Sequence, residues 1–152
     1  HTNDAAGAVT RLLEMGVEPF LVASSLLAVI AQRLVRRLCP HCREPHEIND
    51  LELRELGLNP NEVKRRTVYR PSGKECSFCQ GNGYTGQTGI HELLTVTEKI
   101  RSLILQRVDS GTIKAAAIEE GFETLRVDGA KKVLEGITSV EEVLVVTHEE
   151  LG

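Results

Sequence analysis

All four cysteines of the chain fall into two short pairs with the same spacing. They are Cys39 and Cys42 in the string CPHC, and Cys76 and Cys79 in the string CSFC. A CxxC string places two sulfur atoms on one tight turn, and two such turns supply the four ligands of a closed tetrahedral zinc site. Because four thiolates leave no coordination position for water, the pattern predicts a structural rather than a catalytic metal.

The other common roles of paired cysteines fit this chain less well. Disulfide-bonded proteins are typically small and secreted, whereas this chain has 152 residues, a hydrophobic content of 41% and no signal-peptide pattern. A thioredoxin-like redox site uses one CxxC next to a βαβ unit and leaves the second pair unexplained. His41 and His46 are near enough in sequence to replace a cysteine, but four thiolates already complete the ligand set. We therefore expect both histidines at the surface or as hydrogen-bond donors to the ligands.

The composition limits the number of domains and the class of partner. A chain of 152 residues that is 41% hydrophobic can bury one core and carry a small metal-bound module. Its net charge of -4 argues against neutralisation of nucleic-acid phosphates, and its aromatic content of 3% argues against base stacking. We therefore expect no nucleic acid among its partners.

The N-terminal part of the chain has the apolar spacing of helices. A first helix is predicted after a polar cap within residues 2–4, and Gly16 is expected to end it. Pro19 opens a second helix, and the apolar run that continues to Ile30 predicts a buried helix too short to span a membrane. The residues up to Leu38 fit neither the helical nor the alternating template, although propensity alone extends the helix through them.

A run of basic side chains surrounds the first cysteine pair. It consists of Arg33, Arg36, Arg37 and Arg43. Such runs usually form a solvent-exposed face, and this is the ordinary interpretation. A surface that faces an anion or a partner is the alternative.

Short elements are predicted between the two cysteine pairs. Residues 49–52 have the pattern of a capping box, and the helix that follows is expected to end at Gly57. A further helix is predicted over 59–66, and a short strand at Val68 and Tyr69.

A glycine-rich stretch, residues 81–89, follows the second cysteine pair and leads to a strand predicted over 90–96. Its glycines allow the backbone to wrap around the sulfurs and to offer amide donors to them. Because the stretch precedes a strand and lacks the lysine of a P-loop, we do not expect it to bind phosphate. Neighbouring strand residues face opposite ways, so His91 and Glu92 are interpreted as structural residues rather than an acid–base pair.

The rest of the chain is predicted to be helical. Thr97 and Thr112 are expected to cap two helices, and a third begins near Leu125. Ser139 and Glu142 have the spacing of a capping box for a last helix. The sequence contains no GxxxxGKS, GxxxxGKT, HExxH or GxSxG string, so residue patterns alone support no catalytic function.

Five longer strings occur in a characteristic order. They are HTN (1–3), RLLEMGVEPF (11–20), AQRLVRRLCPHC (31–42), GYTGQTGIHEL (83–93) and GITSVEEV (136–143). Together they resemble the C-terminal part of the secretion ATPase of the bacterial type II secretion system, its E subunit. The resemblance extends over essentially the whole chain and includes the four cysteines. Because the chain opens at His1 without an initiator methionine, we expect it to be a fragment of a longer protein.

The resemblance implies an α/β fold, the C-terminal part of a RecA-like P-loop ATPase domain with an inserted tetracysteine zinc module and a C-terminal helical bundle. The implied boundaries are 1–38 for the ATPase core, 39–83 for the zinc module, 84–96 for a returning core strand and 97–152 for the helices. Residues 32–38 and 90–96 are then neighbouring strands of the RecA-like sheet. This overrides the helix that propensity extends to Leu38.

By the same resemblance, His1 is the histidine of the family's His box and is expected near the γ-phosphate of ATP. The four cysteines match the family's zinc ligands one for one. The family's Walker A and Walker B segments precede the His box, so ATP and Mg²⁺ are expected in the full-length protein. This segment alone is not expected to hydrolyse ATP. Gln87 stands where the family often has an arginine, so any charge contact of that arginine is lost.

The resemblance also implies a cellular context. The full-length protein is expected to be a homo-hexamer that lies in the cytoplasm, peripheral to the bacterial inner membrane. It is expected to contact inner-membrane proteins of the secretion platform and to drive assembly of a periplasmic pseudopilus. No transmembrane segment is expected in this chain.

Three alternatives stay open. The type IV pilus extension ATPases are close relatives with similar cysteines, although the strings at 18–20 and 88–93 favour the secretion branch. The CxxCxGxG string at 76–83 also occurs in zinc-containing heat-shock co-chaperones, which carry four such repeats where this chain has one. A plain zinc-stabilised interaction module is compatible with everything after residue 38.

Overall fold

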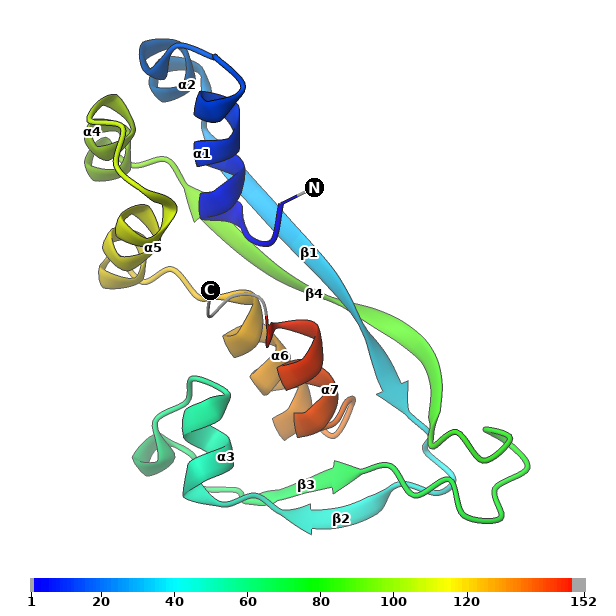
Figure 1. The fold of residues 1–152 in the computed structure, drawn as a ribbon. Helices are drawn as coiled ribbons and strands as arrows, with labels where there is room; N and C mark the ends of the chain where they lie inside the picture. The colour runs from blue at the N-terminus through cyan, green and yellow to red at the C-terminus, as the bar shows by residue number, and fades with distance from the viewer. Residues whose placement is uncertain (1, 149–152) are drawn as a thin grey trace. The chain divides into compact units, whose positions relative to one another are not determined.

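The computed structural model describes residues 2–148, which form two compact units. The first unit combines the described residues up to Gln32 with His91–Thr124, and the second combines Arg33–Ile90 with the described residues from Leu125 onward. Figure 1 shows the helices and strands. In chain order they are α1 (Ala5–Glu14), α2 (Pro19–Ser25), β1 (Ala28–Leu38), β2 (Glu44–Glu47), α3 (Asp50–Glu55), the 3-10 turn η1 (Pro60–Glu62), β3 (Thr67–Arg70), β4 (Tyr84–Thr95), α4 (Glu98–Leu105), α5 (Ser110–Glu119), α6 (Leu125–Leu134) and α7 (Val140–Val146).

In the first unit, helices α1, α2, α4 and α5 surround one hydrophobic core. Helix α1 is capped by Asp4, within the predicted range, and the Asp4 carboxylate accepts a bond from the Gly7 N–H at 2.7 Å. Helix α5 begins at Ser110 rather than after the predicted cap at Thr112, because the Asp109 carboxylate accepts the Thr112 N–H at 2.8 Å. The largest fully buried side chains of this core are Val9, Leu94, Ile100, Ile104 and Ile113.

The predicted length of the second helix is wrong. Helix α2 ends at Ser25, and β1 begins at Ala28 instead of continuing the helix through residue 30. Exposed and less exposed residues alternate along the first part of β1, and Val96 donates a backbone bond to Leu27 O at 2.9 Å. Pairing with β4 therefore outweighs the helical preference of this apolar run.

Strands β1 and β4 are neighbours in a two-stranded sheet, and they run in opposite directions in Figure 1. This confirms the expectation that residues 32–38 and 90–96 lie in neighbouring strands. Both strands are longer than expected, and β4 begins at Tyr84, inside the glycine-rich stretch.

The opposite orientations predicted for His91 and Glu92 are confirmed. His91 is exposed, whereas Glu92 is only 2% exposed. The Oε1 atom of Glu92 accepts a hydrogen bond at 2.7 Å from the N–H of Ala5, the first residue of α1. A carboxylate at this point satisfies an N–H that has no partner within the helix, and it complements the positive end of the helix dipole. Glu92 therefore joins β4 to the start of α1.

In the second unit, β2 pairs with β3 in antiparallel register, with Glu44 opposite Arg70. The sequence patterns do not predict β2, which contains a proline and lacks a run of β-branched residues. Helix α3 has the predicted capping box, in which Asn49 and Glu52 each accept the other's backbone N–H, at 2.9 and 3.0 Å.

The helix predicted over 59–66 is wrong, because only the short turn η1 forms there. The guanidinium of Arg66 folds back over this segment. It donates to Pro60 O at 2.9 Å and to Val63 O at 3.1 Å, so these carbonyls are satisfied without a helix.

Helices α6 and α7 pack closely against each other in the second unit. A Cβ on Gly129 would lie 2.7 Å from a methyl group of Val143, so the approach requires glycine. Ser139 caps α7 by accepting the Glu142 N–H at 3.2 Å, but the Glu142 carboxylate bonds to Arg36 instead of completing the predicted capping box. The core of this unit contains Ile48, Leu53, Leu56, Val68, Ala130, Val133 and Val143.

The helices predicted after residue 97 are present, but they belong to two different units. Helices α4 and α5 belong to the first unit, and α6 and α7 belong to the second. The RecA-like assignment, the helical bundle and the boundaries after residues 38, 83 and 96 stay predictions. Within residues 2–148, none of the helices has the length and apolar character needed to cross a bilayer.

Replacing Glu92 by alanine is expected to lower the free energy of unfolding by about 1–3 kcal/mol, because it removes the acceptor of a buried N–H. Glu92→Gln keeps an acceptor oxygen and is expected to cost less. Urea unfolding of both variants beside the unsubstituted chain measures the difference. Equal losses for the two variants would contradict the capping role.

Candidate metal centre

The four cysteine sulfur atoms converge in the second unit. All four lie within 4.8 Å of one another. The Sγ atoms of Cys39 and Cys76 are 3.9 Å apart, and those of Cys42 and Cys79 are 3.7 Å apart. A tetrahedron of sulfurs around zinc, with bonds of about 2.3 Å, has edges of about 3.8 Å. The donor atoms and their spacing therefore fit a zinc ion with four thiolate ligands.

The alternative roles of these residues find no support in the geometry. All four cysteines are free thiols, so they form no disulfide. His41 is exposed and its ring contacts that of Phe78, with centroids 4.0 Å apart and ring planes tilted by 42°. The Nε2 atom of His46 lies 2.9 Å from a carboxylate oxygen of Glu52. Neither histidine belongs to the sulfur cluster, as expected.

Backbone hydrogen bonds close each cysteine turn and join the two. We call residues 39–42 the first knuckle and residues 76–79 the second knuckle. The Arg43 N–H donates to Cys39 O at 3.1 Å, and the Gly81 N–H donates to Cys76 O at 3.1 Å. The Cys39 N–H donates to Gly83 O at 2.9 Å, which links the first knuckle to the residues after the second.

Glycines permit the close approach of the backbone around the second knuckle. A Cβ on Gly73 would lie 2.4 Å from Gly81 O, and a Cβ on Gly83 would lie 2.7 Å from Cβ of Pro71. Both glycines have positive φ angles, 69° and 82°. Larger side chains at these two positions would therefore push the knuckle apart.

A backbone amide donates a hydrogen bond to one of the cysteine sulfurs. The Gly83 N–H donates to Cys79 Sγ at 3.2 Å. Burial raises the pKa of the Cys79 thiol. The Gly83 bond and the side chains of the other cysteines lower it by a larger amount, so the resulting pKa is about 7. At Cys42, burial dominates and the pKa rises to about 12. Of these two thiols, Cys79 therefore ionises more readily.

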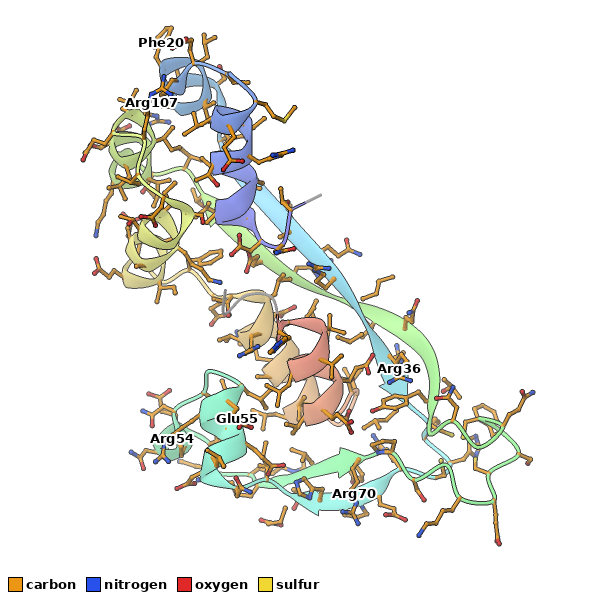
Figure 2. The ribbon with its side chains drawn as sticks, in the orientation of Figure 1. Phe20, Arg36, Arg54, Glu55, Arg70 and Arg107 are labelled. Atoms are coloured by element: carbon orange, nitrogen blue, oxygen red, sulfur yellow. The ribbon has the colours of Figure 1, made fainter. Side chains whose placement is uncertain are left out.

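Arg36 is exposed, as expected for the basic run, but its guanidinium is also paired with a carboxylate of α7. Its Nη2 and Nε atoms donate to the two carboxylate oxygens of Glu142 at 2.8 and 3.1 Å. Figure 2 shows Arg36 at the end of β1, beside β4. Hydrogen bonding to Glu142 raises the pKa of Arg36. Burial alone would raise the pKa of Glu142, but its bonds to Arg36 lower it.

Arg43 is likewise engaged within the unit rather than free at the surface. Its Nη1 atom donates to Gly136 O at 2.7 Å, and its guanidinium carbon lies 4.1 Å from the centre of the Tyr69 ring. The guanidinium of Arg36 stacks in the same way on Tyr84, also at 4.1 Å. Both tyrosines of the chain therefore serve as platforms for an arginine.

Three further predicted positions are His1, Gln87 and Arg37. His1 is outside the described residues, so its predicted role stays a prediction. Gln87 is exposed on β4, in the second unit. Arg37 is exposed as expected for a basic run.

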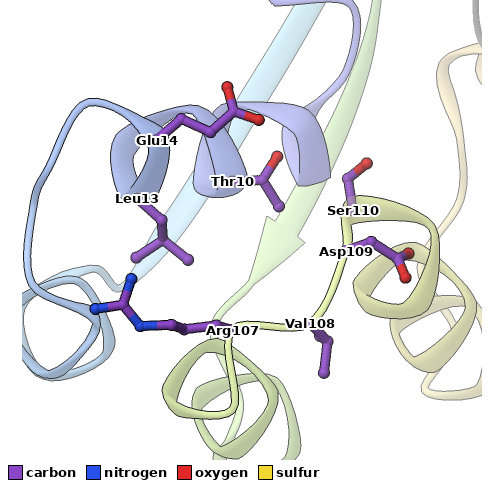
Figure 3. Close-up of a pocket in the computed structure, with 7 residues that line it drawn as sticks. All are labelled: Thr10, Leu13, Glu14, Arg107, Val108, Asp109 and Ser110. Carbon is purple, nitrogen blue, oxygen red and sulfur yellow. The ribbon is translucent and has the colours of Figure 1, made fainter.

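The first unit contains a cleft of about 400 Å³ between α1 and the connection from α4 to α5 (Figure 3). Its lining residues are Thr10, Leu13, Glu14, Arg107, Val108, Asp109 and Ser110. The cleft combines one guanidinium with two carboxylates, and the Asp109 carboxylate is already engaged as the cap of α5. The sequence patterns do not predict this cleft, and its mixed charges point to no single class of ligand.

Comparisons with known proteins match the chain over nearly its whole length. A family model described as "Type II/IV secretion system protein" matches residues 1–145. The type II secretion system protein E of Pseudomonas aeruginosa is 48% identical over 150 residues, which are 99% of this chain and 29% of that protein. The type IV pilus assembly ATPase PilB of Thermus thermophilus is 48% identical over 149 residues, which are 98% of this chain and 16% of that protein.

A third relative agrees with these two. The type II secretion system ATPase E of Vibrio cholerae is 48% identical over 149 residues, or 98% of this chain and 29% of that protein. The chain thus spans less than a third of the length of each of these relatives. Because both the family model and the identities extend over nearly all of its residues, the chain belongs to the family of type II/IV secretion system proteins.

Proposed function

We propose that the chain is the C-terminal part of a hexameric cytoplasmic ATPase that powers type II protein secretion through assembly of a pseudopilus. The observation that carries the proposal is the family match over residues 1–145, together with 48% identity to proteins named type II secretion system protein E and ATPase E. On this proposal, the full-length protein binds ATP and Mg²⁺ and lies at the inner membrane beside the secretion platform. The one co-chaperone-like string covers only residues 76–83, so it supports an adaptor role far less.

A type IV pilus ATPase is the second candidate function, because the chain is as similar to a pilus ATPase as to a secretion protein. The PilB relative from Thermus thermophilus and the E protein from Pseudomonas aeruginosa are both 48% identical to the chain, so identity does not separate the two branches. The strings at 18–20 and 88–93 favour secretion.

Deletion of the parent gene in its host separates the branches. Loss of secreted proteins from the medium, with pili retained on the cells, is the result expected for a secretion ATPase. Loss of pili with unchanged secretion would overturn the secretion proposal in favour of the pilus branch. Measurements of exoprotein activity in culture supernatants and of surface pili by electron microscopy provide the two readouts.

We infer further that the four cysteines hold one structural zinc ion. The support is the convergence of four sulfur atoms at separations of 3.7 and 3.9 Å across the two knuckles. Zinc, when bound, supplies metal–thiolate bonds that tie the two knuckles together. The chain's own contribution is to bring the knuckles into register through the Cys39–Gly83 backbone bond, and to present an amide donor to Cys79.

One zinc ion per chain is expected in protein purified under reducing conditions, as measured by elemental analysis. Replacing Cys79 by serine is expected to reduce the zinc content to near zero, because three thiolates and a hydroxyl form a much weaker site. Ser77→Ala is the matched control, since Ser77 is an exposed residue between two ligands. Full zinc occupancy in Cys79→Ser, or no zinc in the unsubstituted protein, would refute the four-cysteine site.

In the full-length parent, replacing His1 by alanine is expected to lower the rate of ATP hydrolysis by about a hundredfold. This is the usual loss when one group that stabilises charge in a transition state is removed. His148→Ala provides the control, because His148 is exposed and lies two residues beyond the end of α7. Steady-state phosphate release measures both variants, and an unchanged rate for His1→Ala would refute the γ-phosphate role.

A further inference from the structure

The turn between α6 and α7, which we call the α6–α7 turn (residues 135–139), lies against the start of the first knuckle. The N–H of Leu38, the residue before Cys39, donates to Ile137 O at 2.9 Å. The hydroxyl of Thr138 donates to Arg36 O at 2.7 Å, and Thr138 is fully buried. The strand that leads into the first cysteine is thus bonded to this turn twice.

The end of the first knuckle is held by the same turn. Arg43 follows Cys42 directly, and its backbone N–H closes the knuckle on Cys39 O. Its side chain reaches Gly136 O at 2.7 Å. A Cβ on Gly136, which has a φ of 77°, would lie 3.0 Å from both Arg43 Nη1 and a ring carbon of Tyr69. Glycine at this position therefore makes room for the stacked arginine.

The second knuckle is connected to the turn through Tyr84. The Tyr84 hydroxyl lies 2.7 Å from Ser139 Oγ, within hydrogen-bond distance. Tyr84 directly follows Gly83, whose N–H donates to Cys79 Sγ and whose carbonyl accepts the Cys39 N–H. The α6–α7 turn therefore contacts residues that flank both knuckles.

A residue in the first turn of helix α7, Glu142, adds further bonds to the strand that leads into the first knuckle. Glu142 is 7% exposed, and its Oε1 atom accepts the Arg36 backbone N–H at 3.0 Å in addition to the guanidinium bonds. The paired Arg36 side chain also covers the Tyr84 ring. The residues that support the two knuckles are thus bonded to one another as well as to the turn.

We propose that Arg43 is a positioning residue for the metal, and that docking of the α6–α7 turn and metal binding at the four cysteines are energetically coupled. The proposal rests on the zinc site of the proposed function and extends it to residues that are not ligands. Four sulfurs bind zinc well only when their separations match the tetrahedron, and the turn restrains the residues on either side of the first knuckle. The coupling is reciprocal. If docking of the α6–α7 turn raises the affinity for the metal, then metal binding stabilises the docked turn by the same free energy.

The test uses the full-length parent with the Arg43→Met substitution, which removes the donors and keeps an aliphatic stem. Zinc affinity is measured by competition with a chromophoric chelator, and thiolate–Co²⁺ absorption bands report the ligand geometry. We expect affinity to fall about tenfold, the lower end of the loss seen when groups that support metal ligands are removed. Arg43→Lys keeps the charge and is expected to restore part of the affinity.

Arg54→Met is the matched control, because Arg54 is an exposed arginine on α3 of the same unit (Figure 2). Its zinc affinity is expected to equal that of the unsubstituted protein. Tyr84→Phe is a milder second variant that removes only the hydroxyl near Ser139, and it is expected to weaken zinc binding by a smaller factor than Arg43→Met.

Amide hydrogen exchange gives the reciprocal measurement. Removing zinc from the unsubstituted protein is expected to accelerate exchange in α7, and the acceleration is expected to be smaller in Arg43→Met. A purely structural arginine would change exchange equally with and without zinc.

The possible failures are distinguishable. Failure of the unsubstituted protein to bind zinc or Co²⁺ would overturn the zinc site and this proposal with it. Normal metal binding by the unsubstituted protein, with equal affinities for Arg43→Met and Arg54→Met, would overturn only the coupling and leave the zinc site intact.

Discussion

The convergence of four sulfur atoms is the constraint on which the second unit depends. The knuckles stand at the two ends of a long excursion that contains β2, α3 and β3 and has its own buried side chains, such as Leu53 and Val68. The entropy lost when the two ends of a loop are joined grows only slowly with loop length. The length of the segment between the knuckles therefore adds little to the cost of holding its two ends together. The backbone bond from Cys39 to Gly83 joins these ends even before a metal is considered.

The arginines next to the knuckles show how charge is used inside this unit. An exposed ion pair usually contributes little, but Glu142 is buried and receives a two-pronged contact from Arg36. If the partner of a buried carboxylate is removed, the carboxylate charge is left without compensation. The stability lost in this way is much larger than the net stability that the ion pair contributes. Stacking on Tyr84 and Tyr69 orients both guanidinium groups, so each can serve a backbone or carboxylate acceptor at a defined place.

Several features that depend on local chemistry are predicted correctly from the sequence. The cysteine spacing, the capping box at Asn49 and Glu52, and the caps at Asp4 and Thr97 concern neighbours within a few positions, and the structure places them as expected. The switch from helix to strand before Ala28 was missed because it depends on pairing with β4, far along the chain. The partners of Arg36 and Arg43 were missed for the same reason, since a run of arginines looks identical whether it faces solvent or a distant acceptor. The His1 role and the RecA-like assignment rest on resemblance.

The contact between Arg43 and Gly136 joins residues 93 positions apart. During synthesis, the first knuckle therefore leaves the ribosome well before the carbonyl that holds it exists. Long-range contacts of this kind form late in folding, because the two distant segments must come together before their contact contributes any stability. In the nascent chain, the first cysteine pair consequently lacks these contacts until α6, α7 and the turn between them have been translated.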